Sequence, residues 1–160
     1  MPTNFQPRDS HTLTPYITVP SGAGARALAF YAKALGAAET MRFEHQGSIA
    51  HAEFRIGDSA MMLGEEMPEL GYLSPTAIGG TAGGFAIYVP DADAVVAQAV
   101  AAGAELKQPV QDQFYGDRSG SVRDPFGYHW TIATHKEDVS EEEMQRRFRE
   151  YVASAAASAA

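Results

Sequence analysis

Phe114 begins the run Phe-Tyr-Gly-Asp-Arg-Ser-Gly-Ser-Val-Arg-Asp-Pro-Phe-Gly-Tyr-His-Trp, which ends at Trp130 and carries the clearest structural signal in the chain. Within it, Asp124-Pro-Phe-Gly127 is a turn signal, because proline fixes φ at the second position and glycine permits positive φ at the fourth. Short apolar and aromatic runs flank this turn, so we predict strands over Phe114–Val122 and Tyr128–Thr134. An isolated hairpin is only marginally stable, and these strands must therefore belong to a larger sheet.

The rest of that sheet is predicted from a pattern that occurs twice. Tyr-Ile-Thr-Val-Pro at 16–20 is matched by Phe-Ala-Ile-Tyr-Val-Pro at 85–90, and each run precedes an alanine-rich helical segment. Gly36 ends the first helix and Gly103 ends the second. Short strands follow each helix, which indicates an internal duplication. We predict an α+β fold of two βαβββ modules, followed by a C-terminal helix that Ser140 caps.

Five segments are predicted along the chain. Two of them are the modules, which together form one domain, 12–136. The segment between the modules is rich in glycine and proline, as is typical of a linker or surface loop. The boundaries are 1–11 for a flexible lead-in, 12–64 for the first module, 65–82 for the linker, 83–136 for the second module, and 137–160 for a C-terminal helix with a frayed tail.

Composition excludes several classes of function. The chain has no cysteine, so disulfides, thiolate metal sites and thiol nucleophiles are excluded. Its net charge of -8 disfavours nucleic-acid binding, which needs clustered lysine and arginine. No apolar run approaches the roughly 20 residues of a membrane span, and the start lacks the apolar region of a signal peptide. We therefore expect a cytoplasmic protein with no nucleic-acid or membrane partner.

The strand predicted at 48–56 presents the first candidate site. His51 and Glu53 lie two residues apart, so their side chains point to the same face. The alternation places Ile49 on this face and Ala50 on the opposite, buried face. An imidazole beside a carboxylate suits a polar ligand or acid–base catalysis, whereas a solvent-facing polar strand explains both residues equally well.

Further candidates lie in the second module. Tyr115 precedes Asp117 and Arg118, and an Asp–Arg pair beside an aromatic ring suits an anionic or planar ligand. The same pair also suits a purely structural role in fixing a turn. His129 and Trp130 have opposite strand parity, which predicts a ligand-facing position for His129 and a core position for Trp130.

The sequence resembles a known superfamily over about residues 12–147. The matching runs are His51–Ser59, Phe114–Gly120, Asp124–Gly127 with Trp130, and Thr134–Ser140. On these runs the chain resembles the vicinal oxygen chelate superfamily of glyoxalases, extradiol dioxygenases and bleomycin-resistance proteins, and most closely its PhnB-like subgroup. The resemblance implies that each module curls its strands into half a barrel around a small-molecule cavity, and that the protein is a homodimer.

The resemblance also implies where a metal ion would be held. Chelating members of the superfamily carry one His, Glu or similar ligand on each of four strands. The corresponding positions here are Thr14 or Tyr16, Met62, Ala86 and Thr131, none of which offers an imidazole or a carboxylate. We therefore expect neither a bound metal ion nor another cofactor.

Our leading hypothesis is a protein that binds a small organic molecule, as resistance-type members do. The alternative is an enzyme of the same superfamily, of the lyase/isomerase or dioxygenase type, which uses His51, Glu53 and His129. A third hypothesis is a structural or regulatory dimer module without a ligand-sized cavity. The predicted ligand-binding residues are Tyr16, Met62, Tyr88, Tyr115, Asp117, Arg118 and His129.

Overall fold

The structure, a computed structural model, describes residues 5–7 and 10–158. Most of the predicted lead-in, namely residues 1–4 and 8–9, therefore lies outside the described residues. The same holds for residues 159–160 at the end of the predicted tail.

The first module forms a four-stranded mixed sheet, sheet 1, with one helix. The strand order is β1-β4-β3-β2, in which β1 runs parallel to β4 and the other pairs are antiparallel. The elements are β1 (Tyr16–Val19), α1 (Gly24–Leu35), β2 (Ala38–His45), β3 (Ser48–Ile56) and β4 (Ser59–Glu65).

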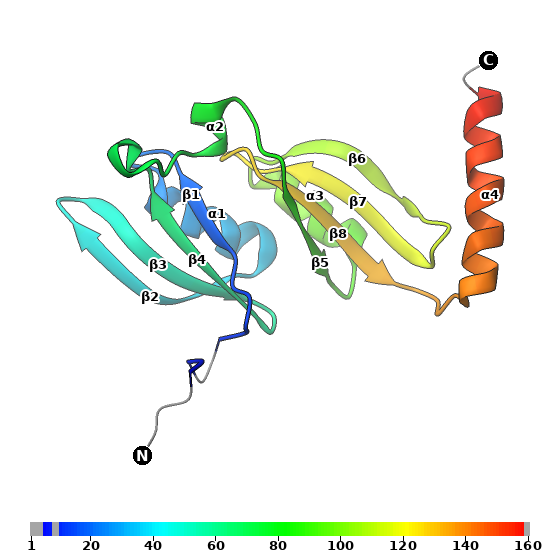
Figure 1. Cartoon of the computed structure of the whole chain (residues 1–160), viewed down its shortest axis with the longest axis horizontal. Helices are drawn as coiled ribbons and strands as arrows, with labels where there is room; N and C mark the ends of the chain where they lie inside the picture. Colours follow the sequence, from blue (N-terminus) through cyan, green and yellow to red (C-terminus); the bar gives the residue numbers. More distant parts are fainter. Residues whose placement is uncertain (1–4, 8–9, 159–160) are drawn as a thin grey trace.

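The second module repeats this topology in a separate sheet, sheet 2. Its strand order is β5-β8-β7-β6, again with one parallel pair, β5 and β8. Both sheets are open rather than closed into a barrel, and the predicted pair of βαβββ modules is confirmed (Figure 1). The elements are β5 (Gly84–Tyr88), α3 (Ala92–Ala101), β6 (Glu105–Asp112), β7 (Asp117–Arg123) and β8 (His129–His135).

The remaining elements lie between and after the modules. The connection carries a short 3-10 helix, η1 (Pro68–Leu70), and one helical turn, α2 (Pro75–Ile78). The C-terminal helix is α4 (Glu141–Ser158), whose first turn is capped as predicted by the Ser140 hydroxyl. Among the described residues, no helix combines the length and the hydropathy that a membrane crossing requires.

The hydrophobic core lies between the sheets and the two longer module helices. In Figure 1, α1 and α3 lie behind the strands, and the two helices contact each other. The small residues of α1 allow close packing, and the Tyr31 ring of this helix is fully buried. The Tyr31 ring stacks on Phe54 of the first module, and its centroid lies 5.7 Å from the ring centroid of Trp130 in the second. Trp130 is 1% exposed, so its predicted core position is confirmed.

We define the outer face of each sheet as the face that points away from α1 and α3. Burial alternates along the strands, so that the inward residues are covered by the helices and the outward ones are not. The outer face of sheet 1 carries Tyr16, Met41, His51, Glu53 and Met62, and that of sheet 2 carries Ala86, Tyr88, Asp117, Thr131 and His135.

The predicted turn at Asp124 is present and also connects the two modules. Gly127 adopts φ +96°, and the Asp124 carboxylate accepts backbone N–H groups of Phe126 and Tyr128, each at 2.9 Å. The same carboxylate accepts the Tyr31 hydroxyl at 2.8 Å and the Trp130 indole N–H at 2.9 Å. A residue predicted only as a turn former is therefore also the polar centre of the core.

A second polar contact joins the edge of sheet 1 to the second module. The Tyr128 hydroxyl donates to the Thr18 carbonyl at 3.0 Å and accepts the Thr18 backbone N–H at 2.9 Å. Thr18 lies in β1, the edge strand of its sheet. One side chain therefore occupies both backbone groups of an edge residue.

Two details of the predicted strands are wrong. Strand β7 begins at Asp117 and not at Phe114, because the chain turns before it: Gln113 donates its N–H to the Asp117 carbonyl, and Gly116 adopts φ +98°. On β3, Ile49 is buried and Ala50 is exposed, the reverse of the predicted alternation. The pairing of β2 with β3 shifts register at this point, and such a bulge inverts strand parity.

Candidate functional site

The outer face of sheet 1 brings together four of the predicted site residues. Tyr16 lies opposite Met62 in the parallel pair of β1 and β4, and Glu53 lies opposite Met62 in the antiparallel pair of β3 and β4. His51 lies two residues before Glu53 on the same strand and the same face. Three strands thus place an aromatic, an imidazole, a carboxylate and a thioether side by side.

Tyr16, His51 and Glu53 form a hydrogen-bonded row. The Tyr16 hydroxyl lies 3.0 Å from His51 Nδ1, and His51 Nε2 lies 3.4 Å from Glu53 Oε1. Partial burial raises the pKa of Tyr16, and the neighbouring Tyr72 raises it further, so the phenol keeps its proton at neutral pH. When the His51 ring accepts from the Tyr16 hydroxyl at Nδ1, its proton lies on Nε2, the nitrogen nearest to Glu53.

A cleft of about 580 Å³ lies at one end of this row. Its size falls within the usual range for small-molecule sites, roughly 300–1,000 Å³. Apolar groups form much of its wall, and one acidic and one basic side chain lie within it. The lining residues are Pro7, Ser10, Thr14, Thr40, Met41, Glu53, Phe54, Arg55, Ala60, Met61 and Met62.

The outer face of sheet 2 brings together a second polar cluster. The Tyr88 hydroxyl donates to Asp117 Oδ2 at 2.8 Å, and His135 Nδ1 lies 2.8 Å from Asp117 Oδ1. The Tyr115 hydroxyl lies 3.4 Å from the Ser119 hydroxyl on the same face. Asp117 is 6% exposed and has neighbours at both oxygens, so it fixes the orientation of Tyr88 and His135.

His129 and Arg118 lie away from this cluster. His129 stands at the start of β8, where it lines a different cleft of about 390 Å³ together with Arg123 and the Asp124 turn. Arg118 points to the opposite face of sheet 2, where its guanidinium pairs with Asp93 in the first turn of α3. A second contact, to Asp112, completes its ion pairs. The structure thus places Arg118 apart from the outer face and from the other predicted ligand residues.

The residues present do not fit a chelated metal ion. Tyr16 pairs with Met62, and Ala86 pairs with Thr131, so the four positions expected to carry ligands do lie in two adjacent pairs. Their side chains nevertheless supply a phenol, a thioether, a methyl group and a hydroxyl, which are poor ligands for Zn²⁺, Fe²⁺ or Mn²⁺. Within the part of the chain that the structure describes, no group of three or more histidine and acidic residues is arranged to hold a metal ion.

Sequence reasoning missed several residues that line these surfaces. His135, which the sequence analysis did not single out, lies on the outer face beside Asp117, because it shares strand parity with Thr131 on β8. Met41 lines the cleft from β2. Met67 and Tyr72 belong to the predicted linker, and no periodic pattern in that segment signals that they face Tyr16.

The chain is similar to known proteins over most of its length. A family model described as Glyoxalase/Bleomycin resistance protein/Dioxygenase superfamily matches residues 14–132. A protein of Mycobacterium bovis, uncharacterized protein Mb0911c, is 36% identical over 137 residues, which cover 83% of this chain and 89% of that protein.

Solved structures share the same architecture. The gene product At5g48480 of Arabidopsis thaliana is 28% identical with a TM-score of 0.63, and the match covers 77% of this chain and 98% of that one. The PhnB protein of Bacillus cereus is 15% identical with a TM-score of 0.59, over 78% of this chain and 99% of that one. At 15% identity, this second likeness concerns the fold alone.

Proposed function

Because the chain belongs to the Glyoxalase/Bleomycin resistance protein/Dioxygenase superfamily, we propose that it binds a small organic molecule on the outer face of sheet 1, without a chelated metal ion. One observation carries the proposal: a cleft of about 580 Å³ is lined by Met62, a thioether at a position where chelating members of the superfamily carry a metal ligand. The resemblance of the fold thus supports a small-molecule site, and the donor set argues against metal chemistry there.

The lining of the cleft suits an organic ligand with a polar edge. Met41 and Met62 offer flexible, polarizable side chains that adapt to irregular apolar shapes. Glu53 and Arg55 place opposite charges on the same wall, which can orient a polar group of the ligand. This combination is sufficient for sequestration, which needs shape and a few polar anchors but no reacting group.

A second candidate is metal-free proton transfer, favoured by the row of Tyr16, His51 and Glu53. A neutral imidazole between a phenol and a carboxylate can take a proton at one nitrogen while it releases one from the other. The Tyr16–His51 distance of 3.0 Å is suitable for such a transfer, whereas the 3.4 Å between His51 and Glu53 is long. We therefore place this enzymatic role second.

We further propose that the protein acts as a homodimer. Large aromatic side chains remain uncovered on the outer faces of both sheets: Phe43 is 58% exposed and Tyr88 68%. Burial of such rings in a second copy would remove a substantial apolar area from water. An open sheet from the partner would also cover the cleft and enclose its ligand.

Metal analysis and ligand titration together test the proposed binding function. The full chain is expressed with Zn²⁺, Mn²⁺ and Ni²⁺ supplied and examined by native mass spectrometry, and we expect no stoichiometric metal. An amide-resolved NMR titration with a library of small organic fragments should shift the resonances of Met41, Glu53 and Met62. The variant Met62→Lys should weaken these interactions, whereas Val100→Lys on α3 should not. Tightly held metal, or an outer face unresponsive to every fragment, contradicts the proposal.

The enzymatic candidate has its own test. His51→Ala is compared with His45→Ala, an exposed histidine on the neighbouring strand, across aldehyde, thioester and phenolic substrates. Turnover that His51→Ala abolishes and His45→Ala preserves, with both variants folded, would favour the enzyme. Fragment binding without turnover in the unaltered chain favours the binding role.

A further inference from the structure

We propose that a second, smaller cavity on the outer face of sheet 1 is a slot for one flat, uncharged aromatic ring. The cavity measures about 190 Å³. The inference rests on the proposed binding function, because the slot lies on the same face as the larger cleft and would hold one part of the ligand. The residues that line the slot are Tyr16, Thr18, Gly64, Glu65, Met67 and Tyr72.

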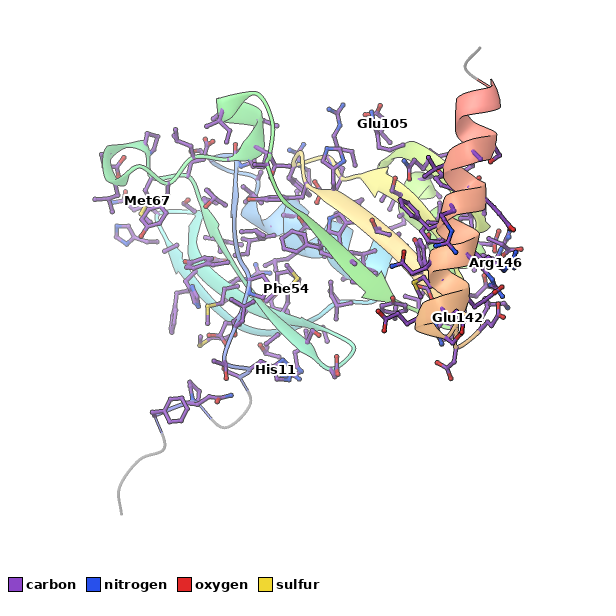
Figure 2. The ribbon with its side chains drawn as sticks, turned by 45° about the vertical axis from the view of Figure 1, so that its right-hand side comes forward. His11, Phe54, Met67, Glu105, Glu142 and Arg146 are labelled. Carbon is purple, nitrogen blue, oxygen red and sulfur yellow. The ribbon has the colours of Figure 1, made fainter. Side chains whose placement is uncertain are left out.

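The outer wall of the slot is a preformed loop. Met67 and Tyr72 form an antiparallel bridge, in which each donates its backbone N–H to the carbonyl of the other at 3.0 and 3.1 Å. Gly71 closes the turn between them with φ +79°. The Glu66 carboxylate accepts the Ser74 backbone N–H at 2.9 Å and fixes the far end of the loop. In Figure 2 the labelled Met67 lies in this loop, at the end of the first sheet.

The floor of the slot is backbone, because position 64 is glycine. A Cβ atom at Gly64 would lie 3.2 Å from the Tyr16 hydroxyl oxygen and 3.5 Å from Tyr16 Cε2. The Tyr16 ring therefore lies close against the strand, and the absence of a side chain at Gly64 keeps the space beside it open. His51 holds the Tyr16 ring in place through the 3.0 Å hydrogen bond and an edge-on ring contact at 5.4 Å.

The walls specify an aromatic ring. Tyr16, Tyr72 and Met67 line the slot with two aromatic rings and a thioether, groups that bind aromatic rings by stacking and by sulfur–ring contact. A cavity of about 150 Å³ is known to hold benzene, so the volume of this slot suits one ring with a small substituent. The Tyr16 hydroxyl oxygen can also accept a hydrogen bond from a polar substituent of the ring.

The ring must be uncharged, because the one carboxylate at the slot is already engaged. Glu65 accepts the backbone N–H groups of Gly22, Gly24 and Ile49 and the hydroxyl of Ser48, on the side of the strand that faces α1. It is 5% exposed and cannot turn toward a ligand without losing these bonds. A cationic ring would find no free counter-charge there, and the overall charge of -8 disfavours an anionic one.

Two small primary amides test whether the slot prefers a flat ring to a puckered one. Benzamide and cyclohexanecarboxamide carry the same neutral amide on a ring of six carbons; the first ring is flat and aromatic, and the second is puckered, saturated and thicker. An amide-resolved NMR titration of the full chain should show benzamide shifting the Gly64, Met67 and Tyr72 resonances. Because ring stacking contributes modestly, we expect benzamide to bind about threefold to tenfold more tightly than its saturated analogue.

Loop variants assign the effect to the slot. Tyr72→Ala should reduce benzamide affinity by about threefold to tenfold, and Tyr72→Phe should retain it. Leu70→Ala is the matched control, since Leu70 is 65% exposed in the same loop and does not line the cavity. Unchanged resonance positions elsewhere in each spectrum show that the variants fold.

The possible outcomes separate this inference from the proposed function. If fragments shift the resonances of Met41 and Met62 but not those of Gly64 and Tyr72, the proposed slot is wrong and the proposed cleft remains. Equal affinity for the two amides, or insensitivity to Tyr72→Ala, overturns the aromatic specificity. A slot covered by a second copy would respond to neither probe, and that result also contradicts the inference. If no fragment shifts any amide resonance of sheet 1, both proposals are contradicted.

Discussion

Asp124 shows how one carboxylate can serve the turn and the core together. Its oxygens accept two backbone N–H groups within the turn and two side-chain donors, the Tyr31 hydroxyl and the Trp130 indole. Burial raises the pKa of Asp124 above the usual range for aspartate, and these hydrogen bonds only partly oppose the shift. Asp124 is only 4% exposed, so the groups that donate to its carboxylate could not bond to water instead if the side chain were removed.

Replacement of Asp124 by alanine should therefore be strongly destabilising. We expect Asp124→Ala to lower the free energy of unfolding by about 3 kcal/mol, because it leaves buried donors unpaired. Urea unfolding followed by the fluorescence of Trp130, the one tryptophan in the chain, measures the change. Glu142→Ala removes an equal charge from the exposed face of α4 and should alter stability little. Similar losses in both variants would contradict the prediction.

His135 gives a pH-dependent contact between β8 and the segment that leads to α4. Hydrogen bonding to Asp117, and then to Asp138, raises the pKa of His135 above its usual value. The folded state therefore binds this proton more tightly than the unfolded state does. The resulting stabilisation is complete below the unfolded pKa of about 6.5 and is lost as pH rises through the folded pKa.

An NMR titration of the His135 ring protons measures this shift directly. We expect a midpoint above about 6.5 in the unaltered chain and a lower midpoint in Asp117→Asn, which removes the larger cause. Asp138→Asn should lower it less, because Asp138 lies fully exposed at the surface. A midpoint that neither variant moves would show that the two carboxylates do not hold the proton.

At the level of elements, the start of α1 depends on a residue from another strand. The N-cap position, Ala23, has no side-chain cap, and the Glu65 carboxylate of β4 binds the N–H groups of Gly22 and Gly24 instead. A Cβ atom at Gly24 would lie 2.7 Å from Glu65 Oε1 and 2.8 Å from Ile49 Cβ. The helix can approach the sheet this closely only because position 24 has no side chain.

This close approach predicts the effect of a single methyl group. Gly24→Ala should lower the free energy of unfolding by about 2 kcal/mol, despite the better helix propensity of alanine, because it forces Glu65 or Ile49 to move. Gly80→Ala is the control, since a Cβ atom at Gly80 meets nothing within 4 Å. Thermal unfolding compares the two. If Gly24→Ala is as stable as Gly80→Ala, Glu65 and Ile49 can move aside without a loss of stability, and the prediction is wrong.

The sequence was informative about elements and less so about their details. The duplicated pattern predicted both modules, because each strand and helix carries its own period and its own stop signal. The bulge at Ala50 was not predictable, since alanine fits either face and the register of β2 against β3 sets the parity there. Glu65 looks like an ordinary end-of-strand acid in the sequence. Its role as a cap comes from a contact with residues more than forty positions earlier.

At the level of the whole molecule, the sequence predicted the individual residues of the candidate site but not which of them lie together. Tyr16, His51 and Glu53 share one face because strand parity places them there. No local pattern indicates that Tyr88 and Asp117 form a separate cluster on the second sheet, since this depends on the order in which β5, β8 and β7 pair. Arg118 was the least predictable, because its partner Asp93 comes from the first turn of α3.

The exposed rings of the outer faces lead to a prediction about assembly. We expect the chain of 17.1 kDa to elute and scatter light as a species of about twice that mass. Phe43→Glu places a charge on the outer face of sheet 1 and should shift the equilibrium toward monomer by about tenfold or more. Val100→Glu, on the helix side of the second module, should leave the mass unchanged. A monomer at every concentration, or a dimer indifferent to Phe43→Glu, contradicts this expectation.

The contact between Tyr128 and Thr18 has a consequence for strand pairing. An unpaired edge strand is a template on which another chain can add, and β1 is such an edge. The Tyr128 hydroxyl occupies both the N–H and the carbonyl of Thr18, so an added strand would have to displace it at the middle of a four-residue strand. Because Tyr128 belongs to the second module, this contact between the modules also disfavours the addition of another chain at the edge of sheet 1.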